Sequence, residues 1–226
     1  MKKQVIIVAG GHGVRMGSDI PKQFLLLNGK PLLMHTVEAF YYYDSEINII
    51  LVLPEDYFLL WKELREAYRF RIAHRIVSGG STRFHSVQNA LPFVEPDSIV
   101  AVHDGDRPLI SREVIAKAYL AMENSKAACP VIPLTDSLRV KIKNGTRSVN
   151  RNNYFLVQTP QIFHSKILLS AYLYPYQETF TDDISVVEFS RKCPVTMIEG
   201  SPENIKITTP VDLATAEAIL KSKCPV

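Results

Sequence analysis

Short apolar runs rich in Val and Ile alternate along the chain with longer segments of helical periodicity. Continuous apolar runs of four to seven residues are typical of strands buried on both faces. The runs occupy residues 5–8, 47–53, 75–78, 98–103 and 127–133. Between them, apolar residues recur three and four positions apart, which predicts helices over residues 31–42 and 55–68. This alternation predicts an α/β fold with a mostly parallel central sheet and helices on both faces.

Capping residues mark the predicted helices of the second half of the chain. Ser81 is expected to cap a helix that follows a glycine pair, Ser111 a helix running to Glu123, and Ser165 a helix ending near Tyr172. The last two predicted helices span residues 184–189, after Thr181-Asp182-Asp183, and residues 210–221, capped by Thr209. Short strands are predicted at residues 195–198 and 204–207.

In residues 134–155 the apolar residues no longer recur at helical spacing but alternate with polar ones. Three apolar residues (Leu138, Val140, Ile142) alternate with three cationic ones (Arg139, Lys141, Lys143), and an Asn-Gly-Thr turn follows. This pattern predicts a β-hairpin with one apolar and one cationic face. Because an isolated two-stranded hairpin is marginally stable in water, we expect this arm to lie against another surface.

Composition restricts the class of protein further. The chain has 226 residues, of which 46% are hydrophobic, enough for the core of one α/β domain spanning residues 1–226. It has no apolar run of transmembrane length, and its basic start leads directly into a strand, unlike a signal peptide, so we expect a cytoplasmic protein. A net charge of +3 without basic blocks gives no indication of nucleic-acid or membrane binding. The three cysteines show no zinc or disulfide spacing.

The first apolar run ends in a glycine-rich loop. Ala9, Gly10, Gly11 and Gly13 are followed by the cations Arg15 and Lys22. Small residues at the carboxyl end of a strand let backbone N–H groups approach an anion, so the loop predicts a phosphate site. Neither the Walker pattern nor the dinucleotide fingerprint is present. A glycine-rich turn with solvated cations remains the alternative on these residues alone.

Two further segments carry candidate chemistry. After the third apolar run, Gly79-Gly80 precedes a helix on which Arg83 and Ser86, three positions apart, share one face. After the fourth, Asp104 is a candidate Mg²⁺ ligand, since Mg²⁺ takes one or two carboxylates plus phosphate oxygens, and Arg107 is close enough to reach the same pocket. The alternatives are a capped helix beside a turn, and a solvated Asp-Gly-Pro turn.

Taken together, the motifs resemble those of a known enzyme family. The string A-G-G-x-G-x-R-M-x(4)-P-K-Q resembles the signature of sugar- and polyol-phosphate nucleotidyltransferases, and its Pro-Lys-Gln ending is most similar to cytidylyltransferases that act on 2-C-methyl-D-erythritol 4-phosphate. The strings GGSTRFHSV, HDGDRP, QTPQ, TDD and ENIKITTPVDL follow in the order of that family, so the resemblance spans residues 5–220.

The resemblance implies a Rossmann-like nucleotidyltransferase fold and Mg²⁺-dependent transfer of CMP from CTP to the polyol phosphate, in non-mevalonate isoprenoid biosynthesis. It also implies a homodimer in which the arm reaches into the neighbouring subunit. Arg15 and Lys22 match residues that stabilise the transition state, and Arg151 and Lys206 match residues that position the substrate. The matched CTP-binding residues are Ala9, Gly10, Gly11, Gly13, Gly79, Gly80, Arg83 and Ser86. Those matched to the acceptor are Asp104, which also matches the metal ligand, Arg107, Ser137, Thr159 and Thr181.

At two positions the sequence departs from the family pattern, and these departures leave more than one polyol phosphate open as the acceptor. Gly105-Asp106 stands where the family usually has two small apolar residues, and Ser137 stands where Thr is commoner. The Asp106 carboxylate either faces away from the reactants, assists the metal or contacts a hydroxyl group. Ribitol 5-phosphate is the alternative acceptor. A uridylyl- or guanylyltransferase and a non-catalytic nucleotide-binding regulator are the other functions compatible with the sequence.

Overall fold

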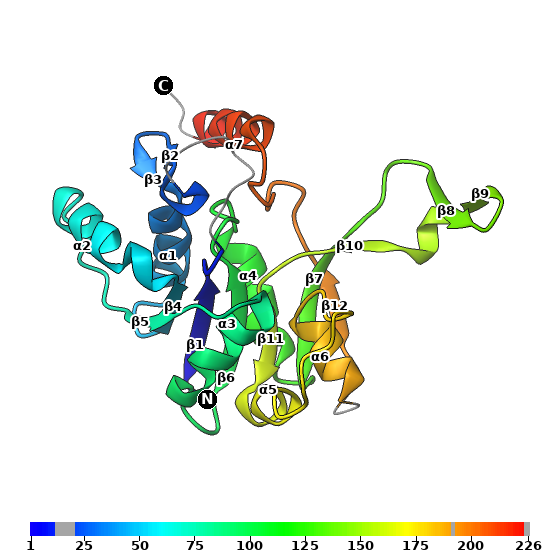
Figure 1. Cartoon of the computed structure of the whole chain (residues 1–226), viewed down its shortest axis with the longest axis horizontal. Coiled ribbons are helices and arrows are strands. Elements are labelled where there is room, and N and C mark those ends of the chain that lie inside the picture. Colours follow the sequence, from blue (N-terminus) through cyan, green and yellow to red (C-terminus); the bar gives the residue numbers. More distant parts are fainter. Residues whose placement is uncertain (12–20, 191–192, 224–226) are drawn as a thin grey trace.

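The computed structural model describes residues 1–11, 21–190 and 193–223, which form a central sheet with helices on both faces (Figure 1). In spatial order the strands are β10 (Phe155–Val157), β7 (Ala127–Pro133), β11 (Gln161–His164), β6 (Ile99–Asp104), β1 (Lys3–Val8), β4 (Asn48–Leu53) and β5 (Arg75–Ser78), with β12 (Thr196–Glu199) beside β7. Strands β6, β1, β4 and β5 are mutually parallel, as are β7 and β12, whereas β11 and β10 run antiparallel to their neighbours. The predicted mostly parallel α/β fold is confirmed.

Alternate residues of the central strand β1 enter two separate cores. Val5 and Ile7 pack with the helices α1 (Leu32–Tyr43), α2 (Phe58–Ala67) and α4 (Arg112–Ala121). Ile6 packs on the opposite face with α3 (Arg83–Ala90), α5 (Ser165–Ala171) and α6 (Asp183–Phe189). Because both faces of β1 are covered, its sequence reads as a continuous apolar run without a polar face. Trp61 of α2 is fully buried in the first core, as expected for a packing residue.

A third, smaller core lies beyond the carboxyl ends of the strands. It joins β2 (Leu26–Leu27), which pairs with β3 (Lys30–Pro31), to helix α7 (Pro210–Lys223), which lies above β1 in Figure 1. Leu27, Ile207 and Ala216 are fully buried in it. This layer holds the segment before α7 over the end of the sheet, where it contributes to the cavity described below.

Two predicted helix caps and one predicted strand differ from the structure. Thr82, not Ser81, caps α3, because its extended backbone directs Oγ1 to the N–H of His85. Ser165 is the first residue of α5, and its hydroxyl accepts the N–H of Ser98 instead. Residues 204–207 form no strand, since the N–H of Ile207 is donated to the carbonyl of Asp106 in a loop.

The predicted hairpin is confirmed and projects from the body of the molecule (Figure 1). Strands β8 (Leu138–Ile142) and β9 (Gly145–Val149) pair with each other and, within the described part of the chain, with no other strand. Gly145 in the turn has φ +110°, a conformation that favours glycine. On this single chain Val140 and Ile142 remain 39% and 45% exposed, so the apolar face of the arm is uncovered.

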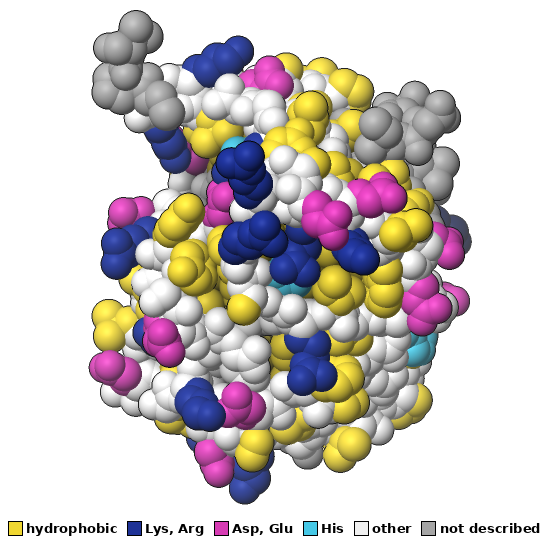
Figure 2. Space-filling view, turned by 90° about the vertical axis from the view of Figure 1, so that its left-hand side faces the viewer, with side chains coloured by type: hydrophobic (Ala, Val, Ile, Leu, Met, Phe, Trp, Pro, Cys, Tyr) yellow, Lys and Arg dark blue, Asp and Glu magenta, His cyan; other side chains and the backbone are white. Residues whose placement is uncertain are grey.

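The surface is mixed in charge. On the face shown in Figure 2, Lys and Arg side chains are interspersed with acidic and hydrophobic ones. No helix in the described ranges is long and apolar enough to cross a membrane.

Candidate active site

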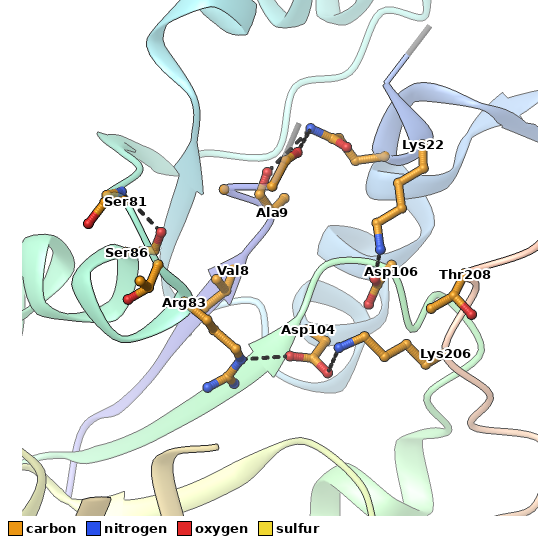
Figure 3. Close-up of a pocket in the computed structure, with 15 residues that line it drawn as sticks. Val8, Ala9, Lys22, Ser81, Arg83, Ser86, Asp104, Asp106, Lys206 and Thr208 are labelled. Carbon is orange, nitrogen blue, oxygen red and sulfur yellow. Dashed lines mark hydrogen bonds and ion pairs between the residues drawn. The ribbon is translucent and has the colours of Figure 1, made fainter. Parts of the chain in front are cut away.

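A cavity of about 610 Å³ opens at the carboxyl ends of β1 and β6 (Figure 3). Open α/β sheets bind ligands in this position, beyond the carboxyl ends of their central strands. The lining residues are Val8, Ala9, Gly10, Gly11, Lys22, Gln23, Gly80, Ser81, Thr82, Arg83, Ser86, Asp104, Asp106, Lys206 and Thr208. They come from distant parts of the chain, so the fold assembles the site from separate motifs.

The two glycine motifs meet on one side of this cavity. A Cβ at Gly10 would stand 2.7 Å from the hydroxyl of Ser86, so only glycine lets the loop approach α3 this closely. The same hydroxyl accepts the N–H of Gly80 at 3.0 Å. Gln23 donates its amide to the carbonyls of Ala9 and Gly11 at 3.3 and 3.2 Å. The start of the loop is therefore held by both the second glycine motif and the Pro-Lys-Gln segment.

A buried carboxylate, Asp104, forms the floor of the cavity at the end of β6. Its Oδ1 accepts from Arg83 Nε at 3.2 Å, and its Oδ2 accepts from Lys206 Nζ at 3.0 Å (Figure 3). Oδ2 also accepts from Arg107 Nε at 3.4 Å. Burial alone would raise the pKa of this carboxyl, but Arg83, Lys206 and Arg107 hold the pKa well below its usual range. Asp104 is therefore ionised at neutral pH and fixes three cations around itself.

Arg83 is held on its other side by a second buried carboxylate. Its Nη2 lies 2.8 Å from Oδ2 of Asp183, which is fully buried and accepts the hydroxyl of Tyr172 at 2.5 Å. Burial would lower the pKa of the Arg83 guanidinium, but Asp183 and Asp104 hold that pKa well above its usual value. The guanidinium is thus a permanent charge in a fixed orientation, which is the preorganisation that electrostatic catalysis needs.

Lys22 and Asp106 form a second ion pair on the opposite wall of the cavity. Lys22 Nζ lies close to Asp106 Oδ2, and their side chains are only 22% and 9% exposed. The other oxygen of Asp106 is buried and has no hydrogen-bond partner among the described residues. Of the three alternatives for Asp106, the structure disagrees with the one in which it faces away, because the carboxylate lines the cavity.

Behind Asp104 runs a chain of buried hydrogen bonds. Thr159 Oγ1 accepts the N–H of Asp104 at 3.1 Å and lies 2.9 Å from Nδ1 of His103. Nε2 of His103 lies 3.2 Å from the carbonyl of Arg107. Burial lowers the pKa of His103 to about 4, so the ring is neutral at pH 7. His103 therefore supports the end of β6 through its hydrogen bonds.

The sequence as a whole matches one family. A family model described as 2-C-methyl-D-erythritol 4-phosphate cytidylyltransferase matches residues 4–222. The chain belongs to this cytidylyltransferase family. Relatives carrying that name in Azobacteroides pseudotrichonymphae and Phocaeicola vulgatus are 54% and 52% identical, each alignment covering 97% of this chain and 99% and 100% of the relative.

Solved structures of the cytidylyltransferase family share the fold. The 2-C-methyl-D-erythritol 4-phosphate cytidylyltransferase of Thermus thermophilus is 32% identical, covers 98% of this chain and 100% of its own, and superposes with a TM-score of 0.79. The 4-diphosphocytidyl-2C-methyl-D-erythritol synthase of Anaerococcus prevotii is 29% identical with a TM-score of 0.83 and covers 97% and 98% of the two chains. The Rossmann-like nucleotidyltransferase fold implied by the motifs is thereby confirmed.

The structure brings most, but not all, of the cytidylyltransferase motif residues together. Those that line the cavity are Ala9, Gly10, Gly11, Lys22, Gly80, Arg83, Ser86, Asp104 and Lys206. Gly79, Arg107 and Thr159 lie behind this lining. Ser137, Arg151 and Thr181 are exposed and do not line it. Gly13 and Arg15 lie outside the described residues.

The sequence does not single out every residue of the site, and Gln23, Asp183 and Thr208 are examples. Gln23 belongs to the Pro-Lys-Gln string, which is the signal that could have identified it as a brace for the loop. Asp183 is marked by its sequence only as part of a helix start, and nothing local indicates that it faces Arg83, 100 residues earlier in the chain. Nothing in the sequence around Thr208 indicates that it lines the cavity either, since the third core positions the segment before α7 that contains it.

The carboxylates of the cavity suit a hard cation. No group of three or more His, Cys, Asp or Glu side chains that could hold a metal occurs in the described ranges. Mg²⁺ does not need such a cage, because it is usually held by one or two carboxylates together with substrate phosphates and water. Asp104 is ionised and its Oδ1 accepts one hydrogen bond from the described residues, so this oxygen retains capacity for a metal. Its donor chemistry therefore fits Mg²⁺.

Proposed function

We propose that this chain transfers CMP from CTP to 2-C-methyl-D-erythritol 4-phosphate, giving 4-diphosphocytidyl-2-C-methyl-D-erythritol and pyrophosphate. The observation that carries this proposal is the cavity at the end of β1, where the backbone of Gly10 and Gly11 faces three cations fixed by buried carboxylates. Such a cavity suits a polyphosphate, and the names of the relatives supply the nucleotide and the acceptor.

The reaction needs charge stabilisation more than proton transfer. The phosphate monoester of the acceptor is largely ionised at neutral pH, since its second pKa lies near 6, and it attacks the α-phosphorus of CTP without a general base. The obstacles are bringing two polyanions together and stabilising the charge that develops on the transferred phosphorus. Lys22 and Arg15 act on this charge in the proposed mechanism, and Lys206 and Arg151 orient the acceptor phosphate.

The proposed cofactor is Mg²⁺, held by Asp104 together with phosphate oxygens of CTP. The ion would neutralise charge on the triphosphate and favour departure of pyrophosphate. In this proposal Arg83 and Ser86 hold the nucleoside with Gly79, Gly80 and Ala9, and Gly13 continues the phosphate loop. Arg107, Ser137, Thr159 and Thr181 belong to the acceptor side.

A homodimer is the proposed assembly, with the arm of each subunit lying on its neighbour. Support comes from the arm itself, because Val140 and Ile142 are uncovered on one chain. Strand β10, at the base of the arm, is also exposed, with Phe155 and Leu156 at 42% and 52%. Arg151 is exposed beside the arm and does not line the cavity of its own chain, so we propose that it completes the cavity of the partner.

The test is a pyrophosphate-release assay with each nucleoside triphosphate against a panel of polyol phosphates. We expect release only with CTP and Mg²⁺, and fastest with 2-C-methyl-D-erythritol 4-phosphate. Faster release with ribitol 5-phosphate would replace the acceptor but keep the cytidylyl transfer. Release with UTP or GTP would overturn the choice of nucleotide, and no release with any pair would indicate a nucleotide-binding protein without catalysis.

A further inference from the structure

The ion pair between Lys22 and Asp106 lies inside the cavity, where the proposed function places developing negative charge. A carboxylate so close to a triphosphate repels it, so its presence calls for a compensating role. Asp106 follows Asp104 by two positions, just beyond the carboxyl end of β6. Its side chain is only 9% exposed, and Oδ2 faces the ammonium of Lys22 (Figure 3).

The backbone on both sides of the Asp106 side chain is held by neighbouring segments. Its carbonyl accepts the N–H of Ile207 at 2.9 Å. The preceding carbonyl, of Gly105, accepts the hydroxyl of Thr36 at 2.9 Å, and a Cβ at Gly105 would stand 2.9 Å from that of Ala9. Because these hydrogen bonds tie the turn to α1 and to the segment before α7, the backbone from which the Asp106 carboxylate projects is held in place. The side chain of Asp106 is also shorter than that of Lys22 and has fewer rotatable bonds, so Asp106 is the less mobile partner of the pair.

We propose that Asp106 is a positioning residue for Lys22, which it holds extended into the cavity before CTP binds. This inference rests on the proposed function. A lysine ammonium has three N–H donors, so one can stay on Asp106 Oδ2 while two face the α-phosphate. A free lysine side chain carries considerable rotamer entropy, and fixing it beforehand removes that cost from the reaction step.

This role has two consequences of opposite sign. Removing the carboxylate leaves Lys22 mobile and slows turnover. It also removes a negative charge beside the triphosphate and strengthens CTP binding, an effect that salt weakens. A residue needed only for stability would lose turnover and CTP affinity together, so the two measurements separate positioning from a purely structural role.

The experiment is a double-mutant cycle on the full-length enzyme with Lys22→Ala, Asp106→Asn and the double variant. Turnover is measured by pyrophosphate release, and CTP affinity by titration calorimetry at low and high salt. We expect Asp106→Asn to lower kcat about 10- to 100-fold and to tighten CTP binding about five- to tenfold at low salt. In the Lys22→Ala background, Asp106→Asn should change kcat by less than about twofold, because the lysine through which it acts is absent.

Two further variants keep the test decisive. Asp106→Glu retains the charge and should keep CTP affinity near that of wild type while recovering part of the turnover. Asp44→Asn breaks a second Asp–Lys pair, to Lys3 at the amino end of β1, and should change neither quantity. It matches Asp106→Asn in chemistry but lies away from the cavity.

Additive losses of kcat in the cycle would overturn the proposal, since Asp106 would then act independently, as a metal ligand or on an acceptor hydroxyl. A rise in kcat for Asp106→Asn would show that Asp106 inhibits the action of Lys22. Weaker CTP binding in the same variant would show that Asp106 has a structural role. Both outcomes contradict positioning. If wild type itself releases no pyrophosphate, the proposed function fails, and that result is distinct from an active wild type with an additive cycle.

Discussion

At the scale of single residues, Lys22 is the cation of the cavity to which the proposed mechanism assigns the charge on the transferred phosphorus. We expect Lys22→Ala to lower kcat about 10²–10³-fold, the usual effect of removing one preorganised donor, and to lower CTP affinity less than tenfold. Lys117→Ala, which breaks a surface pair with Glu199, is the control and should leave both unchanged. Steady-state kinetics and calorimetry check the prediction. A variant that kept its turnover and lost only CTP affinity would show that Lys22 binds the ground state.

A second prediction for a single residue concerns His103, which makes the stability of the fold depend on pH. Burial lowers its folded-state pKa to about 4, whereas the unfolded chain has a pKa near 6.5, so between these values the unfolded state binds more protons. Stability is therefore lost as pH falls, by about 2 kcal/mol between pH 7 and pH 5 from this residue. Urea unfolding of His103→Gln should show a loss smaller by about that amount. Equal losses in the two proteins would mean that His103 is not buried neutral.

At the scale of elements, the turn between β5 and α3 depends on Gly80. A Cβ there would stand 2.5 Å from Cβ of His85 and 2.7 Å from its carbonyl carbon, and the backbone atom cannot rotate away. We expect Gly80→Ala to lower the free energy of unfolding by about 2–3 kcal/mol. Gly11→Ala is the matched control, because no atom of the described residues lies within 4 Å of the position that its methyl group would take, and it should change stability by less than about 0.5 kcal/mol. Denaturant titrations compare the two variants.

Elements were predictable from the sequence where local pattern decides them. The Val- and Ile-rich runs gave β1, β4 and β5 to within about two residues, because buried strands need apolar residues on both faces. Helix caps were less predictable, since Ser81 and Thr82 are both capable caps and backbone geometry selects Thr82. Residues 204–207 have the apolar alternation of a strand but satisfy their hydrogen bonds in a loop across the sheet end, a long-range choice that no local pattern records.

At the scale of the whole molecule, the arm predicts a shared site. Lys22→Ala and Arg151→Ala should each be inactive alone, and a mixed dimer of the two should have one site with both defects and one with neither. After subunit exchange in a 1:1 mixture, about half of the dimers are mixed, so activity should return to about a quarter of the wild-type value. The measurement is pyrophosphate release, with exchange followed independently by mass. Full exchange without recovery would show that Arg151 acts within its own chain.

The sequence predicted which motifs form the candidate site but not which side chains contact one another within it. The family resemblance and the position of motifs at strand ends indicated Asp104, Arg83, Lys22 and Lys206, and the structure gathers all four around one cavity. The sequence did not reveal that Asp183 and Asp106 are the partners that hold Arg83 and Lys22 in place. Which carboxylate faces which cation depends on how helices and loops pack, and spacing along the chain carries no information about it.

The contact between Lys206 and Asp104 also has a consequence for the order in which the cavity is completed during synthesis. The two residues are 102 positions apart. At ribosomal rates of about 5–20 residues per second, Asp104 is made roughly 5–20 s before its Lys206 partner. Arg83 and Arg107 are translated close to Asp104 and can neutralise it in the meantime. We therefore expect the cavity, with the charge balance around Asp104 that the structure shows, to be complete only after Lys206 has been synthesised.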